Sequence, residues 1–149
     1  MQRNRIRLAA LIGAVTGAIL LPLRALAAQW NEKAFDETRF PDALKSVGAL
    51  DLVESEQIEL KTPEIAENGA IVPMQVTSNI PDTEKIHVFA EKNPQPLVAS
   101  FTFRKGTQPF FATRIKMGES ARVHVVVLAD GKYYTISRDV KVTIGGCGE

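Results

Sequence analysis

The sequence predicts a mainly β protein with a short helical segment near its N-terminal end and a flexible C-terminal arm. From Ile58 onward apolar and polar residues alternate with a period of two, and β-branched residues become frequent, which is the pattern of half-buried strands. Turn-forming residues interrupt this pattern at fairly even spacing, and no helical run joins one strand to the next. Short strands without crossover helices indicate an antiparallel β-sandwich of immunoglobulin-like type. The Cys-Trp-Cys spacing of true immunoglobulin domains is absent, so the expectation concerns the architecture alone.

Residues 1–27 have the features of an export signal that is removed from the mature chain. Four arginines and no acidic residue accompany an apolar run over 8–23, and Ala25-Leu26-Ala27 fits the small-x-small cleavage pattern. The apolar run is shorter than the ~20 residues that a spanning helix needs, so a membrane anchor is the less favoured interpretation. Arg3-Asn4-Arg5 lacks the consecutive pair of a twin-arginine signal, which leaves both Tat-like and Sec export open. We expect a periplasmic protein that begins at Ala28 and has no membrane attachment.

The charge balance of the remaining chain argues against a nucleic-acid-binding protein. The whole chain has 18 basic and 17 acidic residues, and four of the basic ones lie in 1–27. The rest therefore has 14 basic against 17 acidic residues and a net charge of −3, whereas nucleic-acid-binding proteins present clustered basic surfaces. Its length suits one domain rather than two, and we expect that domain to span 28–144.

The first part of the mature chain is the helical part. Apolar residues recur with roughly helical spacing between Trp30 and Gly48. Pro41 suits the first turn of a helix, and Gly48 suits the residue that follows a helix end. We therefore expect two short helices that end near Gly48, with Trp30, Phe35 and Phe40 covering one edge of the core.

Seven or eight strands are expected after this segment. Pro73 indicates an edge strand or a bulge, because proline cannot donate to a β-ladder. In the run that begins at Leu97, the residues Leu97, Ala99, Phe101 and Phe103 should share one face. Asp130-Gly131 supplies the positive φ angles of a tight hairpin turn. The expected strands are Ile58–Leu60, Ala70–Thr77, Lys85–Ala90, Leu97–Arg104, Phe110–Lys116, Ala121–Leu128, Tyr133–Ser137 and Asp139–Ile144.

No group of residues in the domain predicts catalysis, and no cofactor is expected. His87 and His124 lie within expected strands, where a lone histidine is more often hydrogen bonded than a metal ligand. A zinc or copper site needs three or four converging ligands, and no spacing motif supplies them. Nucleophile elbows, zinc-protease motifs and phosphate loops are also absent from the sequence.

The C-terminal arm, 145–149, contains the only cysteine of the chain. Cys147 is flanked by Gly145, Gly146 and Gly148, which leave the backbone free and the sulfur accessible. Gly145 to Cys147 would reach about 10 Å when extended, enough to enter a pocket of a partner protein. An exported protein with an odd cysteine has a reactive thiol or an intermolecular disulfide. An incidental cysteine in a frayed tail is the less favoured interpretation.

Activation of Cys147 is expected to come from a partner protein. A free cysteine has a pKa near 8.5, and the thiolate is the nucleophile. The carboxylates at Glu149 disfavour the thiolate by like-charge repulsion, and Lys141 is the nearest basic residue in the sequence. We therefore expect a carrier rather than an enzyme. A structural subunit with an intermolecular disulfide and a thiol-based metal-delivery protein remain as alternatives.

The export signal, the β-rich domain and the ending Val-Lys-Val-Thr-Ile-Gly-Gly-Cys-Gly together resemble SoxY, the sulfur-carrier subunit of bacterial thiosulfate oxidation. The family ends in Gly-Gly-Cys-Gly-Gly, and here Glu149 replaces the last glycine. The resemblance implies a heterodimer with a SoxZ-like β-sandwich subunit and covalent attachment of thiosulfate to Cys147 by a c-type cytochrome. It further implies a hydrolase that releases sulfate and, in some systems, a sulfane dehydrogenase. Haem, manganese and molybdenum would belong to these partners.

Overall fold

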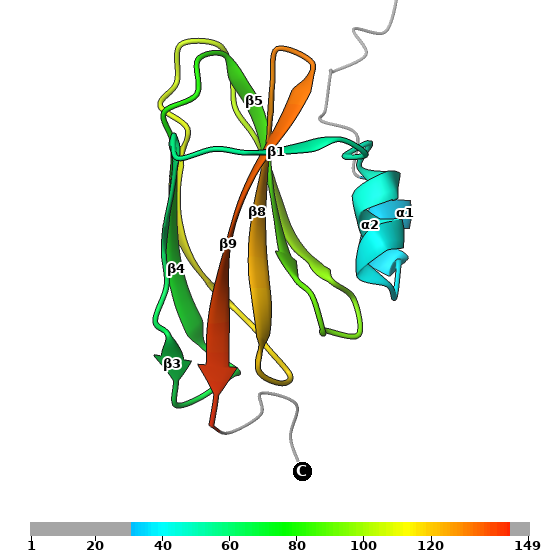
Figure 1. Cartoon of the computed structure of the whole chain (residues 1–149), viewed down its shortest axis with the longest axis vertical. Coiled ribbons are helices and arrows are strands. Elements are labelled where there is room, and N and C mark those ends of the chain that lie inside the picture. Colours follow the sequence, from blue (N-terminus) through cyan, green and yellow to red (C-terminus); the bar gives the residue numbers. More distant parts are fainter. Residues whose placement is uncertain (1–30, 144–149) are drawn as a thin grey trace, which may run out of the picture.

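The computed structural model describes residues 31–143. The predicted export signal, Trp30 and the predicted arm from Gly145 to Glu149 lie outside the described residues. Two sheets pack face to face, and two short helices cover the outer face of the larger sheet (Figure 1). The predicted sandwich is therefore confirmed.

The two helices are α1 (Glu32–Asp36) and α2 (Phe40–Ser46). Asn31 caps α1, because its side-chain oxygen accepts a hydrogen bond of 3.2 Å from the Ala34 amide. Pro41 lies in the first turn of α2, where its missing N–H costs no helical bond. Gly48 follows α2 with a φ of +84°, a conformation that favours glycine. Two short helices ending near Gly48 are thus confirmed.

Within residues 31–143, nine strands form the two sheets. The larger sheet has the order β1-β9-β8-β5-β6, with β3 also paired to β9, and the smaller sheet has the order β2-β4-β7. Asp130 and Gly131, with φ of 48° and 69°, form the predicted hairpin turn between β8 and β9. The strands are β1 (Leu52–Glu54), β2 (Ile58–Lys61), β3 (Ile65–Ala66), β4 (Val72–Ser78), β5 (Thr83–Ala90), β6 (Leu97–Thr102), β7 (Phe110–Ile115), β8 (Ala121–Ala129) and β9 (Lys132–Val142).

The core has two parts, one on each face of the larger sheet. The main cluster lies between the sheets and includes Ile86, Val88, Val125 and Val127, all of which are buried. A second cluster, with Phe89 at its centre, lies between this sheet and the helices. The Phe40 ring meets the Phe89 ring edge-on with centroids 5.6 Å apart. The central strands are therefore buried on both faces, and the predicted covering role of Phe40 is confirmed.

Two predictions about strand pairing were wrong. The expected strands Tyr133–Ser137 and Asp139–Ile144 are one strand, β9, because β8 offers a partner in unbroken register from Ala129↔Lys132 to Ala121↔Val140. The pairing is also not purely antiparallel. The short strands β1 and β3, which were not expected, pair with β9 in parallel, while β2 between them joins the smaller sheet. Between β1 and β4 the chain therefore crosses from the larger sheet to the smaller sheet and back, along the side of the sandwich where β9 and β2 lie.

The predicted face of Leu97 was also wrong. The β5–β6 register passes from Val88↔Ala99 to Phe89↔Leu97, so Val98 is the additional residue of a β-bulge. A one-residue shift exchanges the faces of the strand. Leu97 consequently packs with Phe89 under the helices, whereas Val98 and Ala99 pack against the main core.

Pro73 lies in β4, the central strand of the smaller sheet, but at a position where β4 has lost its pairing with β2. The β2–β4 ladder ends at Lys61↔Gln75, and two residues further on the register would place Pro63 opposite Pro73. Neither proline has an N–H for such a pair. The Thr62 hydroxyl instead donates to the Pro73 carbonyl over 3.3 Å. The prediction of an edge at Pro73 thus holds on the β2 side only.

Candidate functional site

The described part of the candidate site is the base of the C-terminal arm, which we define as Val142 and Thr143 with their contacts. Val142 is the last residue of β9 and Thr143 follows it, and β8 pairs with β9 from Lys132 to Val140. Cys147 and the glycines Gly145, Gly146 and Gly148 follow within a few residues and lie outside the described residues. Their predicted roles therefore stay predictions, and the structure contributes the geometry from which the arm begins.

The β3 side holds the base of the arm through the backbone. Ile65 and Ala66 pair in parallel with Lys141 and Val142. The Thr143 amide then donates to the Ala66 carbonyl over 3.1 Å, and the Thr143 hydroxyl donates to the Glu67 carbonyl over 3.0 Å. Although β3 is short, it extends the support of β9 to Thr143.

The opposite side holds the base through one serine. The Val142 amide donates to the Ser120 hydroxyl oxygen over 2.9 Å, and this hydroxyl lies 3.4 Å from the Val142 carbonyl oxygen. Ser120 therefore takes over where the β8 ladder has ended at Ala121. The consecutive residues Val142 and Thr143 are thus held from opposite sides, so the backbone is fixed up to Thr143.

Sequence reasoning missed both Ser120 and the Glu64–Glu67 segment. A two-residue strand such as β3 gives no detectable periodicity, and serine is common in exposed turns. The only sequence signal was the apolar pair Ile65-Ala66 between Pro63 and Asn68, which is too short to distinguish a strand from a loop. These contacts join residues that are distant in the sequence, so they form only after the fold has brought Ser120 and Ile65–Ala66 beside the end of β9.

The two histidines lie on the adjacent strands β5 and β8 and have different hydrogen-bond partners. His87 Nδ1 lies 2.9 Å from the Ser100 hydroxyl, and burial, together with the charge of Lys85, lowers the pKa of His87 to about 4. His124 Nε2 lies 3.3 Å from a Glu91 carboxylate oxygen, and its ring stacks on Phe40 at 4.4 Å. Burial lowers the pKa of His124, while its hydrogen bond to the Glu91 carboxylate opposes the shift.

Within residues 31–143 no three His, Cys, Asp or Glu side chains gather in a way that could hold a metal ion. The helices of the same range are too short or too polar to cross a membrane.

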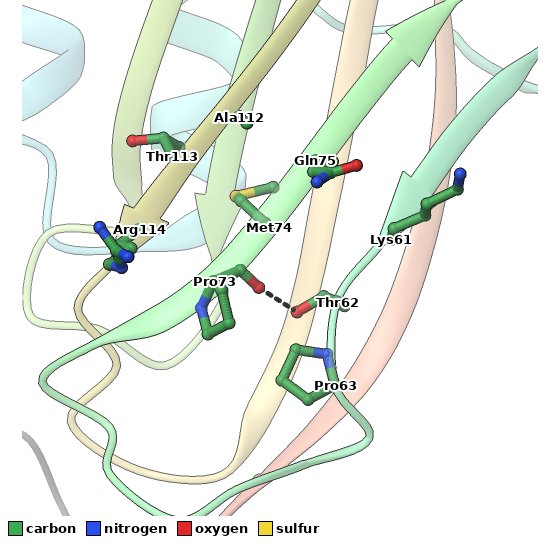
Figure 2. A pocket seen from close by; sticks show the side chains of 9 residues that line it. All are labelled: Lys61, Thr62, Pro63, Pro73, Met74, Gln75, Ala112, Thr113 and Arg114. Atoms are coloured by element: carbon green, nitrogen blue, oxygen red, sulfur yellow. Dashed lines mark hydrogen bonds between the residues drawn. The ribbon is translucent and has the colours of Figure 1, made fainter.

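A groove of about 540 Å³ lies on the outer face of the smaller sheet. Figure 2 shows Lys61 and Arg114 at its two ends, with Gln75 and Ala112 between them and the prolines of β4 and of the segment after β2 along one side. The groove is open, with the end of the β2–β4 ladder forming one wall. The outer face of this sheet therefore carries a shallow basic groove, on the sheet opposite to β9.

Comparison with protein families places most of this chain in one of them. A family model described as sulfur oxidation protein SoxY matches residues 44–147, a range that includes Cys147. No curated protein matches the chain. Among solved structures, the sulfur carrier protein SoxY from Chlorobium limicola f thiosulfatophilum is 42% identical, with a TM-score of 0.65. The match covers 76% of this chain and 100% of that one.

Two other solved structures are more distant. A superoxide reductase (neelaredoxin) from Ignicoccus hospitalis is 12% identical with a TM-score of 0.48, covering 58% of this chain and 80% of that one. The human F-spondin reeler domain is 8% identical with a TM-score of 0.41, covering 61% and 94%. Neither likeness carries functional weight. The family match over more than half of the chain and the 42% identity agree with each other, and the chain therefore belongs to the SoxY family of sulfur oxidation proteins.

Proposed function

We propose that this chain is a periplasmic sulfur carrier that binds thiosulfate-derived intermediates on Cys147 and presents them to partner enzymes. The observation that carries the proposal is the family match, which runs through Cys147. The related protein of known structure is itself a sulfur carrier. The fixed end of β9 supports the proposal, because a carrier arm needs a defined starting point.

The arm works by combining a rigid base with a short reach. Thr143 is held by Ala66 and Glu67, and Cys147 follows four residues later. At ~3.5 Å per residue, the cysteine therefore stays within about 14 Å of the fixed strand end. The flanking glycines Gly146 and Gly148 keep side chains away from the sulfur. A partner that docks against the sandwich would thus find the thiol at a predictable distance.

The covalent step is an oxidation carried out by a partner. The Cys147 thiol and thiosulfate join through a new S–S bond, giving cysteine S-thiosulfonate, one proton and two electrons. A c-type cytochrome would accept the electrons. Water then attacks the terminal sulfone in a hydrolase, releasing hydrogen sulfate and leaving a persulfide on Cys147. In systems with a sulfane dehydrogenase, that remaining sulfur is oxidised before the thiol is regenerated.

This chain acts in the cycle as the carrier subunit and performs none of these steps alone. A SoxZ-like β-sandwich subunit is the expected partner in a heterodimer, and the haem, manganese and molybdenum chemistry belongs to the other Sox proteins. Removal of residues 1–27 during export would place the carrier in the same compartment as these partners.

Intact mass spectrometry of the protein purified from its native source tests the proposal. We expect sulfur-containing adducts of small mass that disappear on reduction and are absent from Cys147→Ser. A mass equal to the chain plus a protein partner, lost on reduction, would favour a disulfide-linked structural subunit instead. A bound metal ion with an unmodified thiol would favour metal delivery. Either result would contradict the carrier function.

A further inference from the structure

The groove on the outer face of the smaller sheet carries two cations. Lys61, the last residue of β2, and Arg114, in β7, lie at its two ends (Figure 2). Neither side chain belongs to an ion pair within residues 31–143. No acidic residue lines the groove, and Glu59, the next outward-facing residue of β2, is hydrogen bonded to Asn79. The groove therefore presents positive charge to an anionic occupant.

The register of the smaller sheet gives the spacing of the two cations. Lys61 lies opposite Gln75, and Gln75 lies opposite Ala112, two residues before Arg114. Neighbouring strands are ~4.8 Å apart and each residue rises ~3.4 Å, so the Lys61 and Arg114 Cα atoms are about 12 Å apart. Both long side chains can turn toward a group that lies between them. This spacing suits the end of an extended segment with more than one negative charge.

The last residues of this chain have the matching charge. The segment 144–149, Ile-Gly-Gly-Cys-Gly-Glu, contains no basic residue. Its final residue, Glu149, has two carboxylates, one on the side chain and one at the C-terminus. Two negative charges on one residue thus correspond to the two cations of the groove.

The groove lies within reach of this tip. The Thr143 amide donates to the Ala66 carbonyl over 3.1 Å, and Ala66 is five residues from Lys61, so those two residues are within about 18 Å of each other. Glu149 follows Thr143 by six residues and reaches about 21 Å from it. The glutamate and lysine side chains extend this reach further. The tip can therefore meet Lys61 while the base of the arm stays bound.

Arg114 also lies toward the end of the sandwich from which the arm begins. The Met117 amide, three residues after Arg114, donates to the Gly69 carbonyl over 2.7 Å. Gly69 is two residues from Glu67, whose carbonyl accepts the hydrogen bond from the Thr143 hydroxyl. The same short segment therefore connects the base of the arm with both sides of the groove.

We propose that the C-terminal arm folds back into this groove, with the two carboxylates of Glu149 between Lys61 and Arg114. Gly145-Gly146 provides the backbone freedom for the reversal of direction. Cys147 then lies against the smaller sheet, two residues from the anchored tip. The arm thus has a docked position and an extended position, and only the extended one presents the sulfur to another protein.

The covalent connection favours the chain's own tip over a separate acidic peptide. A short tether gives the tip an effective concentration in the millimolar range, so weak ion pairs suffice to populate the docked position. Each exposed ion pair changes the ratio of docked to extended arm by up to about fivefold. The arm therefore also opens readily. The docked position does not depend on which group Cys147 carries.

Paramagnetic relaxation in NMR spectra tests the docked position. Cys147 is the only cysteine, so a nitroxide reagent labels the mature chain there and leaves both carboxylates of Glu149 intact. We expect the label to broaden the amide signals of Lys61, Gln75 and Ala112. The amides of α1 and α2, on the opposite face of the sandwich (Figure 1), serve as the reference. Raising the salt from about 0.01 M to about 1 M shortens the screening length from about 30 Å to about 3 Å and should weaken the broadening at the groove.

Three variants remove one charge each, namely Glu149→Gln, Lys61→Gln and Arg114→Gln. Each should reduce the ratio of docked to extended arm by about two- to fivefold and reduce the broadening at the groove accordingly. The matched control is Lys141→Gln, which removes the same charge close to the base of the arm. Its neighbours Val140 and Val142 face the main core, so Lys141 faces away from the smaller sheet, and the broadening should persist.

Four results would overturn the proposal. The first is broadening at the groove no stronger than at the helices, and the second is broadening that does not respond to salt. The third is an equal loss in Lys141→Gln and Lys61→Gln. The fourth is the same broadening in ¹⁵N-labelled Cys147→Ser mixed with nitroxide-labelled chain, since that would arise between two molecules. None of these measurements involves sulfur loading, so any of the four results leaves the carrier function of Cys147 uncontradicted.

Discussion

Acidification should remove about 3 kcal/mol of folding stability through one residue, His87. Its side chain is 6% exposed, and its neighbours include the Phe89 ring at 6.4 Å. Burial and, secondarily, the positive charge of Lys85 lower its pKa to about 4 in the folded protein. In the unfolded chain the pKa is the ordinary value near 6.5.

The direction of the stability change follows from whether the folded or the unfolded state binds the proton. Between about pH 6.5 and about pH 4 the unfolded chain carries a proton on His87 and the folded protein does not. Stability that is complete above the unfolded pKa is therefore lost as the pH falls through this window. One pKa unit corresponds to ~1.4 kcal/mol, so the shift to about 4 amounts to about 3 kcal/mol.

The assay is urea unfolding at several pH values for the wild-type chain, His87→Gln and His124→Gln. Glutamine can still accept a hydrogen bond from the Ser100 hydroxyl, yet it does not titrate. The loss of unfolding free energy between about pH 7.5 and about pH 4 should be smaller by about 3 kcal/mol in His87→Gln than in wild type. Carboxylates also titrate in this range, but they contribute equally to both chains.

His124→Gln is the matched control, because His124 is the only other histidine and its burial is partly offset by Glu91. Most of the acid-induced loss should persist in that variant. The reasoning is refuted if His87→Gln and wild type lose the same stability to within about 0.5 kcal/mol. A titration midpoint of the His87 ring near 6 or above, measured by NMR, would also refute it.

The remaining predictions concern the helical cover and the arm. Gly48→Ala should lower the unfolding free energy by about 1–3 kcal/mol, because φ is +84° and the new Cβ would lie 3.0 Å from the Tyr133 hydroxyl; a change below about 0.5 kcal/mol in urea would contradict this. Cys147→Ser should abolish sulfur loading while changing stability by no more than about 0.5 kcal/mol, and a larger loss in thermal unfolding would mean a structural cysteine. Gly146→Val with Gly148→Val should leave alkylation of the thiol by a small reagent unchanged while slowing loading by the partner enzymes, since valine is stiff at χ1; unchanged turnover would refute an access role for the glycines.

Local sequence patterns determined most of the secondary structure. Pro41 and Gly48 marked the start and end of α2 because their backbone requirements are local. Asp130-Gly131 marked the β8–β9 hairpin for the same reason. In β5 the period of two places Ile86 and Val88 in the main core and Phe89 on the opposite face, toward the helices. The motif around Cys147 also indicated the family without any tertiary information.

Tertiary contacts decided what local patterns do not encode. Leu97 changed face because a bulge at Val98 shifts the register against β5, and such a shift depends on the partner strand as much as on the strand itself. The short strand β3 exists because the end of β9 lies beside it, with Ala66 and Ser120 holding the base of the arm. The sequence by itself predicts which residue would carry the sulfur, and it determined most of the residues that form strands. Only the folded chain decided where the arm begins and which strands form the basic groove, because pairing between distant segments depends on their positions in space rather than on their own residues.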